Sequence, residues 1–266
     1  MNKFTKNRGF DLKSKKYKKI AICACALAVL LALCIGGCAW YVSDYYHTDT
    51  EAIRAFAAQY EVTKTVLSEQ MIAYGDPHAG AGLIFYPGGK VEHTAYEPLM
   101  RALAAEDVLC VLVKMPFHLA VLDVNAADGV RELYPEVEHW YIGGHSLGGS
   151  MAASYVAEHP ADFDGLILLG SYSTADLSDT DLAVLSIFGS EDGVMNREKY
   201  EKYKSSLPAD LTEIEIAGGC HAYFGMYGEQ DGDGIAAMDA EKQITLTAGY
   251  IKNFICKGES PDAENH

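Results

Sequence analysis

The chain has 266 residues, of which 49% are hydrophobic and 22% are charged, and its formal net charge is −16. This composition excludes a disordered or low-complexity chain and is sufficient for one well-buried domain. The acidic balance argues against a nucleic-acid partner, because an acidic surface repels phosphate.

The N-terminal region separates into a basic segment and an apolar one. Residues 1–19 hold eight basic side chains and one acidic one, which leaves about −23 on the remainder. Residues 20–42 contain no charge, and as a helix they would span roughly 34 Å, enough for a bilayer core. We predict a basic cytoplasmic tail over residues 1–19 and a transmembrane anchor over residues 20–42, with the following domain outside the cytoplasmic membrane.

Two alternatives to a retained anchor remain open. The apolar segment can be a cleaved signal peptide, although it is longer than the usual apolar region of one. The stretch Ile35-Gly36-Gly37-Cys38 resembles a bacterial lipobox, in which Cys38 would be lipidated and would still tether the domain. The cysteines beyond this segment (Cys110, Cys220 and Cys256) form no disulfide framework and lack metal-ligand spacing, so we expect no metal and no cofactor.

After the apolar segment, short apolar runs alternate with helical patterns. A helix is expected at residues 50–58 with Thr50 as N-cap, and further helices at 95–105, 147–158, 197–205 and 237–255. Strands are expected at residues 83–86, 108–113, 140–143, 166–169 and 184–188. Because these runs are continuously apolar, the strands should be covered on both faces. We predict one α/β domain over residues 48–258, with a mostly parallel sheet between helices, and a polar tail over residues 259–266.

The glycine-rich stretch "YIGGHSLGGS" supplies the candidate nucleophile. Gly144 to Gly148 fits the pattern G-x-S-x-G, in which the serine occupies a strained turn between a strand and a helix. The bare pattern also occurs in ordinary turns, but here an apolar run precedes it and a helical pattern follows it. We therefore predict that Ser146 is a nucleophile.

A serine hydroxyl needs a base and a group that orients the base. Asp192 follows the strand expected at 184–188, and His221 lies in a glycine-flanked loop after the last strand. Serine, acid and histidine in this order, each after its own strand, are typical of α/β hydrolases. Glu191 is the competing acid, and the competing bases are His93, His118 and His145.

An oxyanion formed at this serine would need two preorganised donors. The backbone N–H of Leu147, at the start of the helix, is one candidate. The second is the N–H of Gly89 or Lys90, in the turn after the first strong strand.

Five segments together resemble a known family. In chain order they read "FYPGGKVE", "VKMPFHLAVLD", "GGHSLGG", "FGSEDGV" and "GCHAYFGMYGEQDGDG", and they resemble bacterial α/β hydrolases that often have an N-terminal membrane anchor. The resemblance runs from about residue 82 to 250 and implies Ser146 as nucleophile, Asp192 as acid and His221 as base. Similar sequences tend to carry Asn at the positions of Cys220 and His118.

The loops limit the substrate only partly. About a dozen residues ("SYSTADLSDTDL") follow the strand at 166–169, so a large cap is excluded and the site should be open. Phe117 and Tyr223 are candidates for an aromatic substrate rim, beside Phe224 and Tyr227, and at least two of the four should only pack the loops. The acidic stretch "EQDGDG" lacks the spacing of a calcium loop, and we expect a turn with solvated carboxylates.

These features predict a membrane-tethered serine hydrolase outside the cytoplasm, most simply a carboxylesterase for a small-molecule ester. An acyltransferase with the same three residues is an alternative that the sequence does not separate. A serine peptidase has no cap or propeller to support it, and a catalytically silent binding module of the cell envelope would be expected to lack one of the three residues. The oligomeric state is not predicted.

Overall fold

The computed structural model describes the backbone of residues 6–258 and the side chains of residues 17–257. The predicted polar tail, residues 259–266, and the first five residues of the predicted basic tail lie outside these ranges. The chain divides into two compact units, residues 1–44 and residues 45–266.

The first unit contains one long helix, α1 (Lys6–Ser43). Within the described residues, its segment Tyr17–Ser43 is the one helix whose length and apolar composition would suffice to cross a membrane. The segment includes the predicted anchor at residues 20–42.

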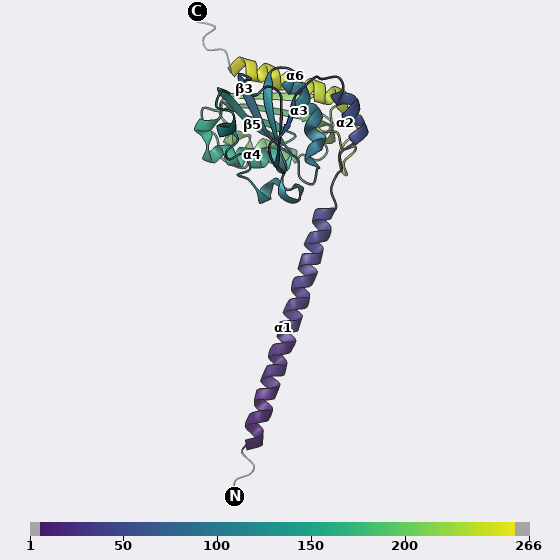
Figure 1. The fold of residues 1–266 in the computed structure, drawn as a ribbon, viewed down its shortest axis with the longest axis vertical. Helices are drawn as coiled ribbons and strands as arrows, with labels where there is room; N and C mark the ends of the chain where they lie inside the picture. The colour runs from purple at the N-terminus through teal and green to yellow at the C-terminus, as the bar shows by residue number, and fades with distance from the viewer. Residues whose placement is uncertain (1–5, 259–266) are drawn as a thin grey trace, which may run out of the picture. The chain divides into compact units, whose positions relative to one another are not determined.

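The second unit has an eight-stranded sheet with helices on both faces (Figure 1). The strands are β1 (Lys64–Val66), β2 (Met71–Tyr74), β3 (Ala81–Tyr86), β4 (Val108–Val113), β5 (His139–His145), β6 (Gly165–Leu169), β7 (Ala183–Gly189) and β8 (Leu211–Ile216). The α-helices are α2 (Thr50–Ala57), α3 (Glu97–Ala104), α4 (Leu147–Glu158), α5 (Arg197–Tyr203) and α6 (Ala240–Gly258). Short 3₁₀ helices are η1 (His93–Tyr96), η2 (Pro116–His118), η3 (Ala120–Leu122), η4 (Arg131–Leu133), η5 (Pro160–Asp162), η6 (Lys204–Ser206) and η7 (Ala222–Phe224).

The strand order is β1-β2-β4-β3-β5-β6-β7-β8, and all strands from β3 to β8 pair in parallel. The chain runs from β3 to β4 on one side and then crosses to β5 on the other side of β3. In an open parallel sheet, such a reversal leaves a crevice at the carboxyl ends of the strands. The crevice is expected beyond the ends of β3 and β5, where the glycine-rich turns at residues 87–89 and 143–149 lie.

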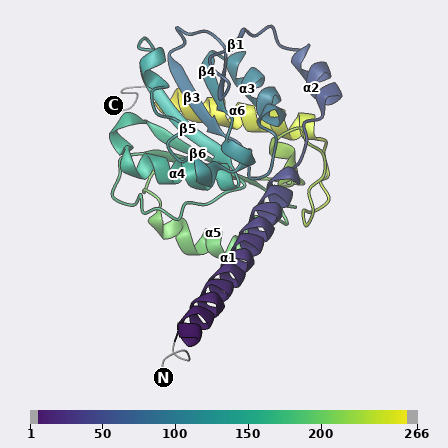
Figure 2. The same cartoon turned by 60° about the horizontal axis from the view of Figure 1, so that its bottom comes forward.

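The sheet is buried on both faces because its strands alternate between two apolar cores. Leu83 and Phe85 of β3 pack in the core that contains α3 and α6, whereas Ile84 and Tyr86 pack in the core that contains α4. Figures 1 and 2 show α4 and α6 on opposite sides of the sheet. This arrangement confirms the predicted α/β class with a mostly parallel sheet.

The structure differs from the sequence prediction at two places before β3. The N-cap of α2 is Asp49 rather than Thr50, because the Asp49 carboxylate accepts the N–H of Ala52 at 3.0 Å. The hairpin formed by β1 and β2 was not predicted. It lies at the edge of the sheet, pairs antiparallel with β4, and has too few buried residues to give a continuous apolar run.

No helix interrupts the chain between β6 and β7, where the sequence predicted that a large cap is absent. The site at the carboxyl ends of these strands is therefore not covered by an insertion at this point.

Candidate active site

Ser146 lies in a strained turn between β5 and α4. Its backbone has φ 52° and ψ −121°, a conformation that costs on the order of 1–3 kcal/mol for a residue other than glycine. The turn is held by three hydrogen bonds: the Ser146 N–H donates to the Leu169 carbonyl at 2.9 Å, and the Ser146 carbonyl accepts from Ser150 N–H at 3.2 Å and from Ser171 Oγ at 2.7 Å. Ser146 itself is half-buried, which leaves it open to a ligand.

The glycines around Ser146 are required by close backbone contacts. A Cβ at Gly144 would lie 2.6 Å from both the Tyr86 carbonyl oxygen and the Gly148 carbonyl carbon. The end of β3 therefore presses against the turn, and a side chain there would displace it.

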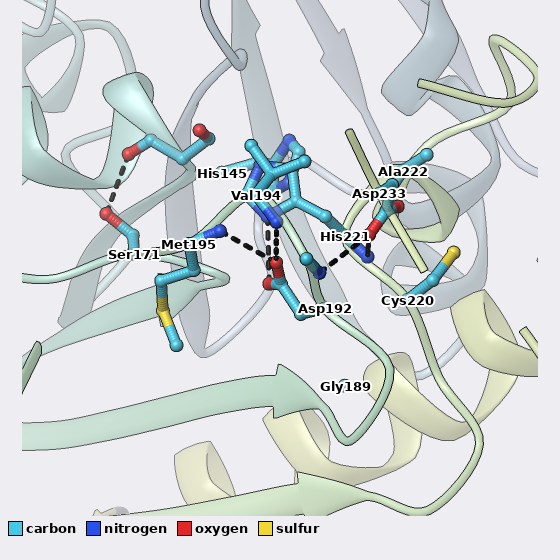
Figure 3. Close-up of polar contacts among 12 residues, drawn as sticks. His145, Ser171, Gly189, Asp192, Val194, Met195, Cys220, His221, Ala222 and Asp233 are labelled. Atoms are coloured by element: carbon cyan, nitrogen blue, oxygen red, sulfur yellow. Dashed lines mark hydrogen bonds and ion pairs between the residues drawn. The ribbon is translucent and has the colours of Figure 1, made fainter. Parts of the chain in front are cut away.

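Asp192 and His221 form a buried pair. Asp192 Oδ2 lies 2.8 Å from His221 Nδ1, and the two side chains are 0% and 1% exposed (Figure 3). The other carboxylate oxygen accepts the N–H groups of Val194 and Met195 at 2.9 and 2.8 Å. Asp192 occupies Nδ1, so the second ring nitrogen of His221 is the one that does not contact this carboxylate.

The competing acid does not contact the histidine. The carboxylate of Glu191 accepts the Ser190 hydroxyl at 2.9 Å and is exposed. The structure therefore pairs His221 with Asp192, as the sequence favoured.

The turn after β6 passes close to this pair. Gly170 has φ 50°, and a Cβ at this position would lie 2.9 Å from His221 Nδ1 and 3.1 Å from Asp192 Oδ2. Since Gly170 directly follows Leu169, which accepts the Ser146 N–H, the turns that carry serine, acid and histidine adjoin at one edge of the sheet.

A second buried histidine, His145, lies next to His221. The ring centroid of His145 is 4.4 Å from that of His221, and His145 Nδ1 is 2.7 Å from the Tyr96 hydroxyl. The Gly88 N–H donates to the same hydroxyl at 3.1 Å, so Tyr96 joins the turn after β3 to His145. Burial, and then the neighbouring His221, lower the pKa of His145 well below its usual value, which keeps this ring neutral.

The sequence indicates His145 only as a competing base and indicates no role for Tyr96. Their contact joins residues 49 positions apart, and no local pattern indicates it.

The candidate oxyanion donors are reduced to one pair. Lys90 N–H donates to the His118 carbonyl at 2.7 Å, so it is not available for a ligand. Across residues 6–258, the N–H groups of Gly89 and Leu147 have no acceptor. A Cβ at Gly89 would lie 3.0 Å from Leu147 Cδ2, so the two turns are in contact. The prediction that the Lys90 N–H is an oxyanion donor is therefore wrong. The N–H groups of Gly89 and Leu147 remain the candidate donors.

The four aromatic residues predicted near the site divide into two groups. Phe224 and Tyr227 are buried in the core, whereas Phe117 is 64% exposed and Tyr223 is half-buried. Phe117 and Tyr223 therefore remain candidates for a substrate rim. Phe117 has φ 50°, and the carbonyl of its neighbour His118 accepts the Lys90 N–H, so Phe117 lies beside the turn at residues 87–90.

Asp233 contradicts the expectation of a turn with solvated carboxylates. Its carboxylate accepts four backbone N–H groups, from Gly193, His221, Ala222 and Gly234. Among the residues with described side chains, no group of three or more His, Cys, Asp or Glu is placed to hold a metal ion.

The loop before His221 is also held by α6. The Gln243 amide accepts the Cys220 N–H at 3.0 Å and donates to the Cys220 carbonyl at 2.8 Å. Burial, with a smaller contribution from Asp233, raises the pKa of the Cys220 thiol to about 12, so the thiol stays protonated and is a poor nucleophile.

Comparison with known proteins identifies the family of the chain. Human monoglyceride lipase is 33% identical over 111 residues, which are 36% of this chain and 35% of that protein, so the chain aligns with about a third of the relative's length. The crystal structure of a hydrolase described as CIB-like, from Thermoplasma acidophilum, superposes with a TM-score of 0.52 at 13% identity, over 73% of this chain and 99% of the other, and shows the fold alone. The profile of the Alpha/beta hydrolase family matches residues 82–245, well over half of the sequence. On this match, the chain belongs to the alpha/beta hydrolase family.

Proposed function

We propose that this hydrolase is a serine carboxylesterase in which Ser146 forms an acyl-enzyme, His221 is the base and Asp192 orients it. The observation that carries the proposal is the buried Asp192–His221 pair at 2.8 Å, beside a serine in a strained strand-to-helix turn. A histidine with only one nitrogen occupied by a carboxylate, next to an accessible hydroxyl, is the arrangement that activates a serine.

In the first step, Ser146 Oγ attacks the acyl carbonyl while His221 accepts the hydroxyl proton. Asp192 stabilises the resulting imidazolium, and the N–H groups of Leu147 and Gly89 stabilise the oxyanion. His221 then donates the proton to the leaving alcohol. In the second step, His221 accepts a proton from water as its oxygen attacks the acyl carbonyl; the bond between Ser146 Oγ and the acyl carbon then breaks, which releases the carboxylic acid, and His221 returns the proton to Ser146 Oγ.

An ester with an apolar acyl group fits the surface beside the site best. Phe117, Val121 and Leu122 are apolar side chains that are 54–64% exposed, and the carbonyl of His118, which follows Phe117, accepts the Lys90 N–H in the turn after β3. Exposed apolar side chains gathered at a site favour an apolar ligand. The similarity to a monoglyceride lipase supports the same substrate class.

The unit that carries this site is proposed to be tethered outside the cytoplasmic membrane. The apolar helix Tyr17–Ser43 supports a tether, and the basic residues before it favour a cytoplasmic N-terminus. Lipidation at Cys38 is the alternative form of this tether.

The test is labelling of the full chain, in detergent, with a fluorophosphonate probe that reacts with activated serines. The parent should be labelled, Ser146→Ala should not, and Asp192→Asn and His221→Ala should react at least about 100-fold more slowly.

Three matched variants serve as controls. Ser154→Ala removes a serine from the same helix, Glu191→Gln removes the neighbouring acid, and His78→Ala removes an exposed histidine. All three should react like the parent. Labelling of Ser146→Ala, or no labelling of a folded parent, would contradict the mechanism. The second outcome would favour the binding-module alternative.

Hydrolysis and acyl transfer are separated by the products. The unlabelled parent enzyme should convert a p-nitrophenyl ester to free acid even with excess alcohol or amine present. A predominantly transferred product would instead favour an acyltransferase with the same three residues.

A further inference from the structure

The loop between η7 and α6 contains a carboxylate with an unusual set of partners. Asp233 Oδ1 accepts the N–H groups of Gly193 at 3.1 Å, His221 at 3.1 Å and Gly234 at 2.9 Å. Asp233 Oδ2 accepts the N–H of Ala222 at 2.8 Å (Figure 3). One half-buried side chain therefore satisfies four backbone donors, three of which belong to other loops.

Those three donors flank the proposed acid and base. Gly193 directly follows Asp192, while His221 is the proposed base and Ala222 follows it. The sequence separations are 40, 12 and 11 residues, so these bonds are not the local pattern of a turn cap. Asp233 joins the backbone of the acid's loop to the backbone of the base's loop.

We propose that Asp233 is a positioning residue, which sets the distance between Asp192 and His221 by binding the backbone of both loops. The inference rests on the proposed function of that pair. A base that shifts by about 1 Å can lose on the order of 100-fold in rate, so a group that holds both loops has a direct effect on catalysis.

Close backbone packing at the same place supports the proposal. A Cβ at Gly193 would lie 2.5 Å from the Gly232 carbonyl oxygen and 3.1 Å from the Gly234 nitrogen. A Cβ at Gly234 would overlap the Glu191 carbonyl oxygen. The 232–234 turn thus lies directly against the 191–193 turn, and Asp233 reaches both loops without a long flexible side chain.

The charge of Asp233 strengthens the connection. Partial burial raises the pKa of this carboxyl, but the four N–H donors outweigh burial and hold the pKa below its usual value. The group is ionised at neutral pH, and hydrogen bonds to an ionised acceptor are roughly twice as strong as neutral ones.

Two further hydrogen bonds join these loops farther from the acid and the base: the Glu191 N–H donates to the Gly219 carbonyl at 2.8 Å, and the Gly218 N–H donates to Ser190 Oγ at 2.8 Å. Asp192 Oδ1 binds the N–H groups of Val194 and Met195 within its own loop, and Gln243 binds Cys220 before the base. Each stabilises one loop alone. Asp233 differs from these groups because its one carboxylate binds backbone N–H groups of both loops at the residues next to the acid and at the base itself.

The test compares Asp233→Asn and Asp233→Ala with the parent, in the full chain in detergent. Asn keeps one oxygen for the Oδ1 donors but presents an NH₂ group to Ala222, whereas Ala removes every bond. We expect kcat for p-nitrophenyl butyrate to fall about 10-fold in Asn and about 100-fold in Ala, with KM changed by less than about 2-fold, because the substrate contacts are retained. Asp231→Asn, an exposed carboxylate in the same loop, is the control and should behave like the parent.

A spectroscopic readout separates positioning from stability. The proton between His221 Nδ1 and Asp192 should give a low-field proton resonance in the parent, assigned by its loss in Asp192→Asn. The resonance should move upfield or broaden in Asp233→Asn and stay unchanged in Asp231→Asn.

Unchanged kcat and an unchanged low-field resonance in both Asp233 variants would overturn the inference, whatever happens to their melting temperatures. If Asp233→Ala does not fold, Asp233→Asn alone decides. Failure of the proposed function looks different: the parent itself would then show no fluorophosphonate labelling and no esterase activity.

Discussion

The candidate site requires a residue without a side chain at position 170, which is Gly170. It follows β6 with φ 50°, and the atoms nearest to a Cβ there belong to His221 and Asp192. Its role is therefore to leave room for the pair, and this role is invisible in the local sequence, where Gly170 reads as an ordinary end of a strand.

Gly170→Ala should inactivate the enzyme without unfolding it. The methyl group would push against His221 Nδ1 at 2.9 Å, and the positive φ would cost about 1–2 kcal/mol. We expect kcat to fall by about 100-fold and the free energy of unfolding by about 1–2 kcal/mol. Esterase kinetics and urea denaturation measure the two effects. Gly249→Ala, in the middle of α6 with open space around it, is the control and should keep full activity.

The buried His145 should make the free energy of unfolding depend on pH. Because burial and His221 lower its pKa in the folded state, the unfolded chain binds a proton on this ring below about pH 6.5 and the folded chain does not. The contribution of His145 to the free energy of unfolding is therefore fully present above pH 6.5. It is lost as the pH falls below this value, at up to about 1.4 kcal/mol per pH unit. The slope of unfolding free energy between pH 7.5 and 5 should be shallower in His145→Gln. Equal slopes in both proteins would mean that the folded ring accepts a proton.

Among the elements, α3 is joined to the edge hairpin by a buried carboxylate. Glu97, in the first turn of α3, lies 2.6 Å from Lys64 Nζ of β1 and 2.8 Å from Arg101 Nε, and it accepts the Tyr74 hydroxyl of β2 at 3.1 Å. The hairpin is short and partly exposed, so this cluster compensates for the small apolar area of β1.

Glu97→Gln should destabilise the fold at neutral pH by about 2 kcal/mol, because Lys64 and Arg101 lose a charged partner in a mostly buried place. Burial raises the pKa of Glu97, but Lys64 and Arg101 hold it below its usual value near 4.5. The stabilisation is thus present above pH 4.5 and lost as the pH falls further, so the parent and the variant should converge towards pH 3. Urea titrations at pH 7 and pH 3 measure this. Glu106→Gln, at an exposed position after α3, should have little effect at either pH.

At the scale of the whole molecule, one apolar helix and one acidic unit make up the chain. The helix Tyr17–Ser43 contains four of the seven cysteines, and Cys38 lies near its end. A retained anchor and a lipid anchor at Cys38 make different predictions for the same residue.

If the helix is the anchor, the full chain should stay in the membrane pellet after an alkaline carbonate wash and keep its full mass. Cys38→Ser should change neither result, because 23 uncharged residues remain. A mature protein that begins at Cys38 with an added lipid mass, lost in Cys38→Ser, would instead establish the lipoprotein alternative.

Much of the architecture was predictable because its signals are local. The core strands read as continuous apolar runs, and α4 begins and ends where the pattern after the serine placed it, at residues 147–158. The hairpin β1–β2 escaped prediction because an exposed edge strand buries too little to leave a pattern. The N-cap of α2 was misplaced by one residue, since Asp and Thr both cap helices well and only geometry separates them.

By itself, the sequence determined the fold class and the order of serine, acid and histidine along the chain, because strand periodicity and glycine-rich turns are encoded over a few neighbouring residues. Only the tertiary structure decided that Asp192 rather than Glu191 faces His221, that His118 occupies the Lys90 N–H, and that Asp233 binds two other loops. The physical reason is that a hydrogen bond between distant segments depends on where the sheet places their ends. The spacing of residues along the chain does not indicate which distant segments the sheet brings together.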